Sequence, residues 1–383
     1  MAAIKIPKTT ESRLAPILSR FTAAHDWAGY STEVHLKREQ FPVPELLYLV
    51  LRQVVGSSDL GSHDKTRWQV PFRYDSVNAL LSHRKRGVCL QLDTTDPETA
   101  KEIQAKLSKL VAIMEKDVLQ RMATQRFRDG RVTVMNQATH LRGAYKYFRR
   151  QAEELLQASE LPDTKELGEF GEPGWLTKGF APQFERLHTG SYNGLAAINA
   201  YFSWLEHVLV LVFAFTDEDA AGGALQAHIG AKWGDKFRRI FNVATNAEAN
   251  RHLSRLHEVD EDYRNTYAHG GFDKAGATIG IQFSGAGAIP AQLSDVYGAP
   301  QFELTPFSPQ LFAETTAKLD EVDAFFRTKE LVLPMRFIDA SLDVSFDRRS
   351  RRQLHNAMRS AETFEAFVQT RMDEVDRHLN MDY

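Results

Sequence analysis

An arginine, an amide and a histidine lie close together in the stretch YRNTYAHGG, residues 263–271. Histidine has an ordinary pKa of about 6.5, so it can take up and return a proton near neutral pH. The planar guanidinium of arginine suits the charge of a phosphate or of a developing phosphorane. His269 and Arg264 are therefore a candidate acid–base and anion-binding pair, and Asn265 offers an amide that could orient either the phosphate or the histidine.

The same residues also fit an ordinary helix end. Glycine is favoured just past a helix, and cations are favoured in its last turn. The spacing is not decisive, since Arg251 and His257 repeat it nearby. On a regular helix, five residues rotate by about 500°, so Arg264 and His269 converge only where the helix ends or unwinds between them. The two glycines that follow His269 supply such an ending.

The stretch YRNTYAHG resembles the signature of HEPN domains, in which an arginine, usually followed by a polar residue, precedes a histidine by a few positions. The resemblance covers roughly residues 190–272. An apolar, aromatic helix pattern (AYFSWLEHVLVLVFAF, 200–215) and a polar one (NRHLSRLHEVDEDYRN, 250–265) precede the signature, as in that family. The resemblance implies an endoribonuclease or nucleotide-binding protein that needs no metal or other cofactor and acts at a dimer interface. It also implies settings such as bacterial phage defence, toxin–antitoxin pairs or RNA processing.

RNA carries its own nucleophile, the 2′-hydroxyl, so its cleavage requires no metal-bound water. Carried over from the family, His269 would be the general acid–base and Arg264 the phosphate clamp, with Asn265 as an orienting group. Tyr267 and Glu206 are auxiliary candidates; Glu206 could orient His269, but a bond to a neighbouring helix is the favoured interpretation because a buried charge needs a partner. The alternative function is a non-catalytic HEPN-like module that dimerises or holds a nucleotide or partner protein.

Cations elsewhere could contact RNA. Residues 120–150 carry eight Lys or Arg and a single Asp, with aromatic residues between them. Stacking rings and cations together bind single strands, whereas the plainer interpretation is a solvated helix face. The candidates for RNA contact are Lys236, Arg239, Arg142, Lys146 and Arg149.

The elements around these residues predict a mainly α protein with a small antiparallel β component. Period-two alternation in RWQVPFRY (67–74) and GVCLQLD (87–93) predicts half-buried strands, and Asp96 with Pro97 predicts a helix start. Helices are also expected at 8–28, 43–56, 191–215 and in the last part of the chain. A glycine-rich hairpin insertion is expected with strands at 278–283 and 302–305, and 270–306 is predicted to be a flap over the site. The predicted domains are an N-terminal α/β domain (1–160), a linker (161–190) and a HEPN-like helical domain (191–383).

Composition narrows the function class. The 383 residues have a formal net charge of −3, which disfavours a protein that coats nucleic acid through its whole surface. The single cysteine, Cys89, excludes an internal disulfide and fits a cytoplasmic protein. No group of His, Asp and Glu has metal-site spacing, and a single cysteine is taken to exclude a cysteine-based zinc site, so no metal site is predicted.

The apolar helix at 191–215 sets the remaining expectations. Its uninterrupted apolar part, Val208–Phe215, is far short of the roughly 20 residues of a membrane span, so we expect a buried core helix and no membrane. The helix has more apolar surface than one helix of a small bundle easily hides, which predicts a homodimer. RNA is the expected ligand, and an antitoxin-like protein is a possible further partner.

Overall fold

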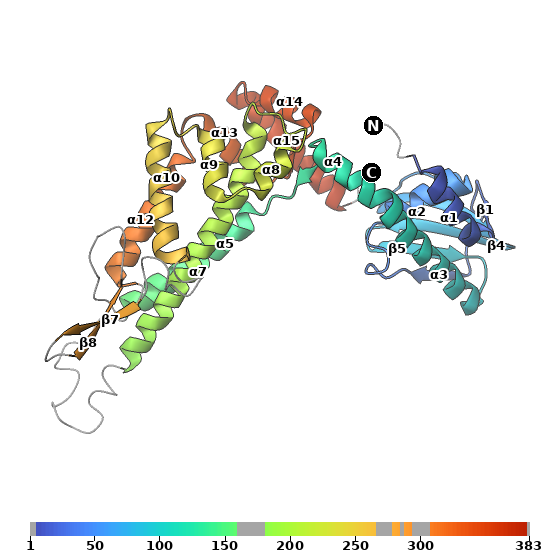
Figure 1. The fold of residues 1–383 in the computed structure, drawn as a ribbon. Coiled ribbons are helices and arrows are strands. Elements are labelled where there is room, and N and C mark those ends of the chain that lie inside the picture. The colour runs from blue at the N-terminus through green and yellow to red at the C-terminus, as the bar shows by residue number, and fades with distance from the viewer. Residues whose placement is uncertain (1–4, 159–180, 266–277, 284–286, 293–306, 381–383) are drawn as a thin grey trace. The chain divides into compact units, whose positions relative to one another are not determined.

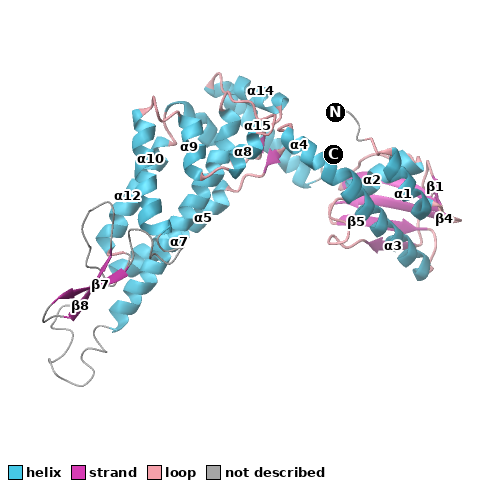
Figure 2. Ribbon diagram, in the orientation of Figure 1, coloured by secondary structure: helices cyan, strands magenta, loops and turns pink. Residues whose placement is uncertain are grey.

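The structure is a computed structural model that describes residues 5–158, 181–265, 278–283, 287–292 and 307–380 (Figure 1). It is mainly helical with a small antiparallel sheet, as the sequence predicted (Figure 2). The chain divides into two compact units, one made of Met1–Asp129 with Glu365–Tyr383 and the other of Gly130–Phe364. Each unit is described by itself below.

The first unit is built on a five-stranded antiparallel sheet. Its strand order is β1 (Phe21–Ala23), β3 (Thr66–Tyr74), β4 (Val77–Arg84), β5 (Gly87–Leu92) and β2 (Thr32–His35). Its helical elements are α1 (Lys8–Leu18), α2 (Glu45–Val50), η1 (Leu51–Val55), α3 (Pro97–Met114), η2 (Glu115–Leu119) and α4 (Gln120–Arg128). Apolar side chains of α1, α2 and α3 form one buried core with the alternate residues Val88, Leu90 and Leu92 of β5.

Local signals set several of these elements. The carboxylate of Asp96 accepts hydrogen bonds from the backbone N–H groups of Glu98 and Thr99, and Pro97 opens α3, as predicted. The predicted strands 67–74 and 87–93 are confirmed as β3 and β5, but β5 is buried on both faces beyond Gly87 and not half-buried as expected. The helix expected at 8–28 is too long, because α1 ends at Leu18 and β1 follows.

The second unit is a helical bundle with two small strand pairs. Its elements are β6 (Thr133–Val134), α5 (Ala138–Gln157), α7 (Ala181–Val212), η4 (Phe213–Phe215), α8 (Ala224–Gly230), α9 (Trp233–Phe241), α10 (Ala247–Val259), η5 (Asp260–Asn265), β7 (Thr278–Phe283), β8 (Gly287–Gln292), α12 (Pro309–Phe325), η6 (Lys329–Leu331), α13 (Val332–Asp339), β9 (Val344–Ser345) and α14 (Arg348–Ala357). Helix α15 (Ala361–Asn380) crosses the division between the units. Helix α5 lies along α7 (Figure 1), and the ring of Tyr145 meets that of Tyr201 at 5.2 Å.

This packing moves the domain boundary. The sequence placed residues up to 160 in the first domain, whereas the structure divides the chain at Gly130. The basic composition of α5 hid its buried face, which consists of Ala138, Tyr145, Ala152 and Leu156. The predicted linker begins in residues outside the described ranges and gives way to α7 at Ala181.

Helix α7 is the core of the bundle. The apolar side chains from Ala197 to Val212 are buried within their own unit, including those of Phe202, Trp204 and Leu205. By length and composition alone α7 with η4 could cross a membrane, but 61% of its most apolar window is buried in the protein, and a core helix passes the same test. Tyr192 of α7 is 66% exposed, so some of the apolar surface on which the homodimer prediction rested remains open, and the dimer stays a prediction.

The hairpin insertion is confirmed for one of its strands. Residues 278–283 form β7, but the antiparallel partner is β8 at 287–292. The predicted partner strand at 302–305 lies outside the described residues. Most of the predicted flap, 270–306, also lies outside them.

Candidate functional site

Arg264 lies where α10 changes its winding. The helix starts at Asn246, whose side chain accepts a hydrogen bond from the backbone N–H of Ala249. Beyond Val259 the chain continues as a π-helix from Asp260 to Asn265. The wider turn of a π-helix is frequent at functional sites, but π-helical turns also occur at η1 and η2 in this chain, so the winding alone identifies nothing.

A buried carboxylate holds the guanidinium of Arg264. Its Nη1 lies 3.3 Å from Oδ1 of Asp260, and the indole Nε1 of Trp233 donates to Oδ2 of the same carboxylate at 3.2 Å. Asp260 is 7% exposed, so its charge depends on such partners. Each of the two carboxylate oxygens thus has a named donor.

An aromatic surface lies beneath the same guanidinium. The Cζ atom of Arg264 is 5.3 Å from the ring centre of Phe202 on α7, within the range of a cation–π contact. The rings of Phe202 and Trp233 are themselves 5.3 Å apart. Three elements, α7, α9 and η5, therefore fix the position of one cation.

Part of the Arg264 side chain remains open to solvent. The side chain of Arg264 is 31% exposed. Within residues 181–265 and the other described ranges, Asp260 is the one acceptor with which it forms an ion pair. Arginine carries five N–H donors in a fork, so this geometry leaves donors for an anion.

The rest of the Arg-Asn-x-x-x-His signature lies largely outside the residues that the structure describes. His269 and Tyr267 lie outside the described residues, and only the backbone of Asn265 is described, as the last residue of the π-helix. Among the predicted catalytic residues, Arg264 is therefore the one whose side chain the structure describes.

Glu206 bonds a neighbouring helix. Its Oε1 is 2.6 Å from Nζ of Lys236 on α9. The side chain of Lys236 is only 2% exposed, whereas that of Glu206 is 39% exposed. The structural interpretation of Glu206 thus holds, and the prediction that Lys236 contacts RNA meets a physical obstacle because its ammonium is buried and paired.

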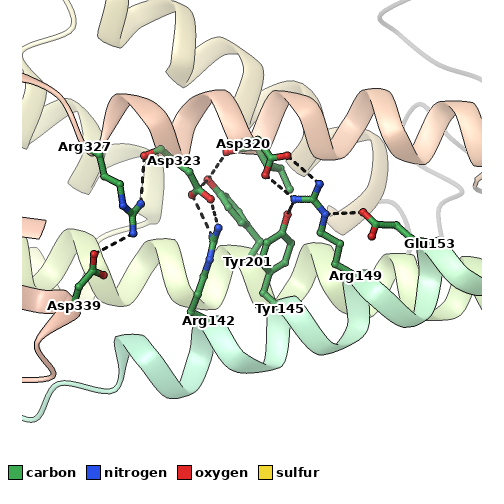
Figure 3. A network of polar contacts seen from close by, with 10 residues as sticks. Arg142, Tyr145, Arg149, Glu153, Tyr201, Asp320, Asp323, Arg327 and Asp339 are labelled. Atoms are coloured by element: carbon green, nitrogen blue, oxygen red, sulfur yellow. Dashed lines mark hydrogen bonds and ion pairs between the residues drawn. The ribbon is translucent and has the colours of Figure 1, made fainter. Parts of the chain in front are cut away.

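Two further predicted RNA contacts, Arg142 and Arg149 of α5, belong to a polar network that joins α5, α7 and α12 (Figure 3). Arg142 pairs with Asp323, and the hydroxyl of Tyr201 donates to Oδ1 of Asp323 at 3.2 Å. Burial raises the pKa of Asp323, and burial also raises that of Tyr201 far above its usual range. Arg142 is therefore a structural cation within the bundle.

Arg149 is fixed in the same way. It binds Asp320 through two parallel hydrogen bonds of 2.6 and 2.9 Å, and its Nε donates to Glu153 at 2.8 Å. The bonds to Asp320 and then Glu153 raise the pKa of this guanidinium. A bidentate Arg–carboxylate pair already uses the donors that a phosphate would need.

The two remaining candidates differ in their surroundings. Arg239 of α9 donates to Glu218 at 2.7 Å and covers the ring of Phe213. Lys146 is exposed on α5 beside the exposed Tyr147, and no carboxylate of the described residues forms an ion pair with it. Lys146 therefore keeps a geometry suited to RNA contact.

Sequence reasoning missed the residues that hold Arg264. Asp260 precedes it by four positions, a spacing that places two helical residues side by side, so this partner was readable from the sequence. Trp233 and Phe202 come from other helices and carried no such signal. His257, of the similar Arg–His spacing, packs on the ring of Trp233 at 4.7 Å and lies 3.2 Å from Nη2 of Arg238.

Comparisons of the chain with protein-family models, curated proteins and solved structures found no match.

Proposed function

We propose that the helical unit is a HEPN-type endoribonuclease that cleaves RNA without a metal. The observation that carries the proposal is the state of Arg264, the first residue of the Arg-Asn-x-x-x-His signature. It is anchored by Asp260 and Phe202, and its side chain is still about one-third exposed to solvent. A phosphate clamp needs a cation that is both held in place and accessible to the phosphate.

The reaction would proceed by attack of the 2′-oxygen on the adjacent phosphorus. His269 accepts the 2′-hydroxyl proton, the bond from phosphorus to the 5′-oxygen breaks, and a proton returns to that 5′-oxygen. Arg264 neutralises the charge that develops on the phosphorane oxygens, and Asn265 orients the phosphate or the histidine. The products are a 2′,3′-cyclic phosphate and a 5′-hydroxyl. A homodimer would bring two signatures into one cleft.

The proposed cellular setting follows from the resemblance to HEPN domains. In this proposal the protein is cytoplasmic and acts in bacterial phage defence or in a toxin–antitoxin pair. RNA is its substrate, and an antitoxin-like protein is a candidate partner.

The second candidate is a non-catalytic module that binds a nucleotide or a partner protein. One observation favours it: Asp260 already pairs with Arg264 and is held by Trp233, which is how a structural cation is bonded. Such a module would bind anions at the same place without cleaving them.

Incubating the purified protein with RNA in EDTA separates the two. The nuclease cleaves RNA under these conditions and leaves 2′,3′-cyclic phosphate ends, and it leaves DNA of the same sequence intact because DNA lacks the 2′-hydroxyl. Binding of RNA or nucleotide without cleavage would support the module. Cleavage that requires added metal would refute the nuclease mechanism.

A further inference from the structure

Three metal-binding side chains of different kinds meet on one face of the sheet in the first unit. In the pairing of β2 with β5, His35 lies opposite Cys89 and Glu33 lies opposite Gln91. Residues two apart on a strand share a face, so Glu33, His35 and Cys89 point the same way. Their ligand atoms all lie within 4.8 Å of one another.

The carboxylate of Glu33 is oriented by two neighbours. Nε2 of Gln91 donates to its Oε2 at 2.6 Å, and Nη1 of Arg84 lies 3.2 Å from the same oxygen. The other oxygen, Oε1, faces Nε2 of His35 at 3.5 Å. Hydrogen bonds that hold one carboxylate oxygen and present the other are the arrangement that supports a metal ligand.

We propose that Glu33, His35 and Cys89 bind a divalent transition metal, with Zn²⁺ as the best fit. Zinc takes thiolate, imidazole and carboxylate ligands together, and three protein ligands leave a fourth position for water. At bond lengths of about 2.0–2.3 Å, neighbouring ligand atoms of a tetrahedral site stand roughly 3.3–3.6 Å apart. The oxygen–nitrogen distance already has this value.

His35 is the ligand that can move to complete the tetrahedral geometry. The side chain of His35 is 65% exposed, so it can shift toward Cys89 by about 1 Å without disturbing a core. Cys89 is fully buried and anchors the site from within the sheet.

Spacing along the chain does not reveal this group, because strand pairing alone joins His35 to Cys89. The prediction of no metal site considered only that spacing, and Cys89 lies 54 positions after His35. The inference does not rest on the proposed function, since the ribonuclease chemistry needs no metal and belongs to the other unit.

Cobalt titration of the full-length protein, after removal of metals by chelation, tests the site. Co²⁺ should bind in a single tight step, with a thiolate-to-cobalt charge-transfer band and the visible absorption of tetrahedral Co²⁺, and Zn²⁺ should displace it. His35→Gln should weaken Co²⁺ binding by at least about tenfold. Cys89→Ser should abolish the charge-transfer band. His63→Gln, which alters an exposed histidine of the same unit, should change neither.

Two results would overturn the proposal. One is the absence of a charge-transfer band in the unaltered protein at saturating Co²⁺. The other is equal Co²⁺ affinity in the His35→Gln and His63→Gln variants. Because Cys89 is buried and its substitution can disturb folding, the exposed His35 decides the matter if Cys89→Ser does not fold. RNA cleavage in EDTA is a separate readout, so failure of either proposal is recognised independently.

Discussion

Asp260 and Arg264 are joined across one turn of a π-helix, with Nη1 of the arginine 3.3 Å from Oδ1 of the aspartate. The aspartate is nearly buried, and the arginine is about one-third exposed. The pair thus links the interior of the bundle to the partly exposed side chain of Arg264. If Arg264 clamps a phosphate, Asp260 determines where the clamp points.

Asp260→Asn tests this link. The amide keeps the size of the side chain and can still accept from Trp233, but it loses the charge that holds Arg264. We expect RNA cleavage to fall at least tenfold and stability to fall by about 1–3 kcal/mol, the cost of weakening a buried polar contact. Trp233→Phe removes the indole donor and some ring volume but leaves the charge of Asp260, so it is the control, with a smaller loss of cleavage. Unchanged cleavage in Asp260→Asn would mean that the pair has no role in the reaction.

The Glu206–Lys236 pair should respond asymmetrically to substitution. Glu206→Gln leaves the ammonium of Lys236 buried without its countercharge, and we expect a loss of about 3 kcal/mol, near the lower end for a broken buried pair. Lys236→Met keeps an apolar stem of similar length and leaves a carboxylate that water can reach, so the loss should be smaller. Urea unfolding of both variants measures the difference. A larger loss for Lys236→Met would contradict this account of which charge depends on the other.

His207 should make stability depend on pH. Its Nε2 accepts a hydrogen bond from the backbone N–H of Gln137, the residue before α5, at 2.9 Å, and burial lowers its pKa below the ordinary 6.5. A group whose folded pKa is depressed gives stability that is present above its unfolded pKa and is lost as the pH falls through its folded pKa. The contribution of His207 should therefore decline as the pH drops below about 6.5.

His207→Gln is the matched variant for that test, because glutamine keeps an acceptor and does not titrate. Thermal unfolding from pH 7.5 to 5 should show a flatter decline for this variant than for the unaltered protein. Parallel curves for the two proteins would show that His207 does not contribute.

The cations of α5 should separate into two kinds. Arg142→Ala leaves Asp323 buried without its cation, so it should destabilise the bundle by about 3–5 kcal/mol. Lys146→Glu reverses an exposed charge and should leave stability within about 0.5 kcal/mol of the unaltered protein. If α5 contacts RNA, Lys146→Glu should weaken RNA binding and make it less sensitive to salt. Equal RNA affinity in the Lys146→Glu variant would remove α5 from the RNA surface.

Local patterns predicted the elements that depend on local physics. The helix cap at Asp96 and the strands β3 and β5 could be predicted from the sequence because residues near one another in the chain determine them. Strand β4 was missed because Leu80 and Leu81 are adjacent, so its sequence, VNALLSHR, lacks a clean alternation. Helix α5 was assigned to the wrong unit because its charges were read as a surface, whereas Asp320 and Asp323 of α12 neutralise two of them.

The site shows the same limit. Asp260 could be found from its helical spacing to Arg264, but Phe202 and Trp233 come from separate helices and become neighbours only in the folded bundle. His35 and Cys89 likewise meet through strand pairing. The sequence therefore predicts which residue types could form a site. It does not predict the partners that come together only through packing between distant parts of the chain.

The most direct test of the proposed function is the rate of RNA cleavage by His269→Ala, measured in EDTA beside His140→Ala, which removes an exposed histidine of α5. Loss of a proton-transfer group should lower the rate by at least about a hundredfold, while the His140 variant should cut as the unaltered protein does. Arg264→Ala should lose cleavage similarly, and Arg251→Ala, at an exposed position of α10, should not. Cleavage by His269→Ala at the rate of the unaltered protein would contradict the catalytic account and leave the bundle as a binding module.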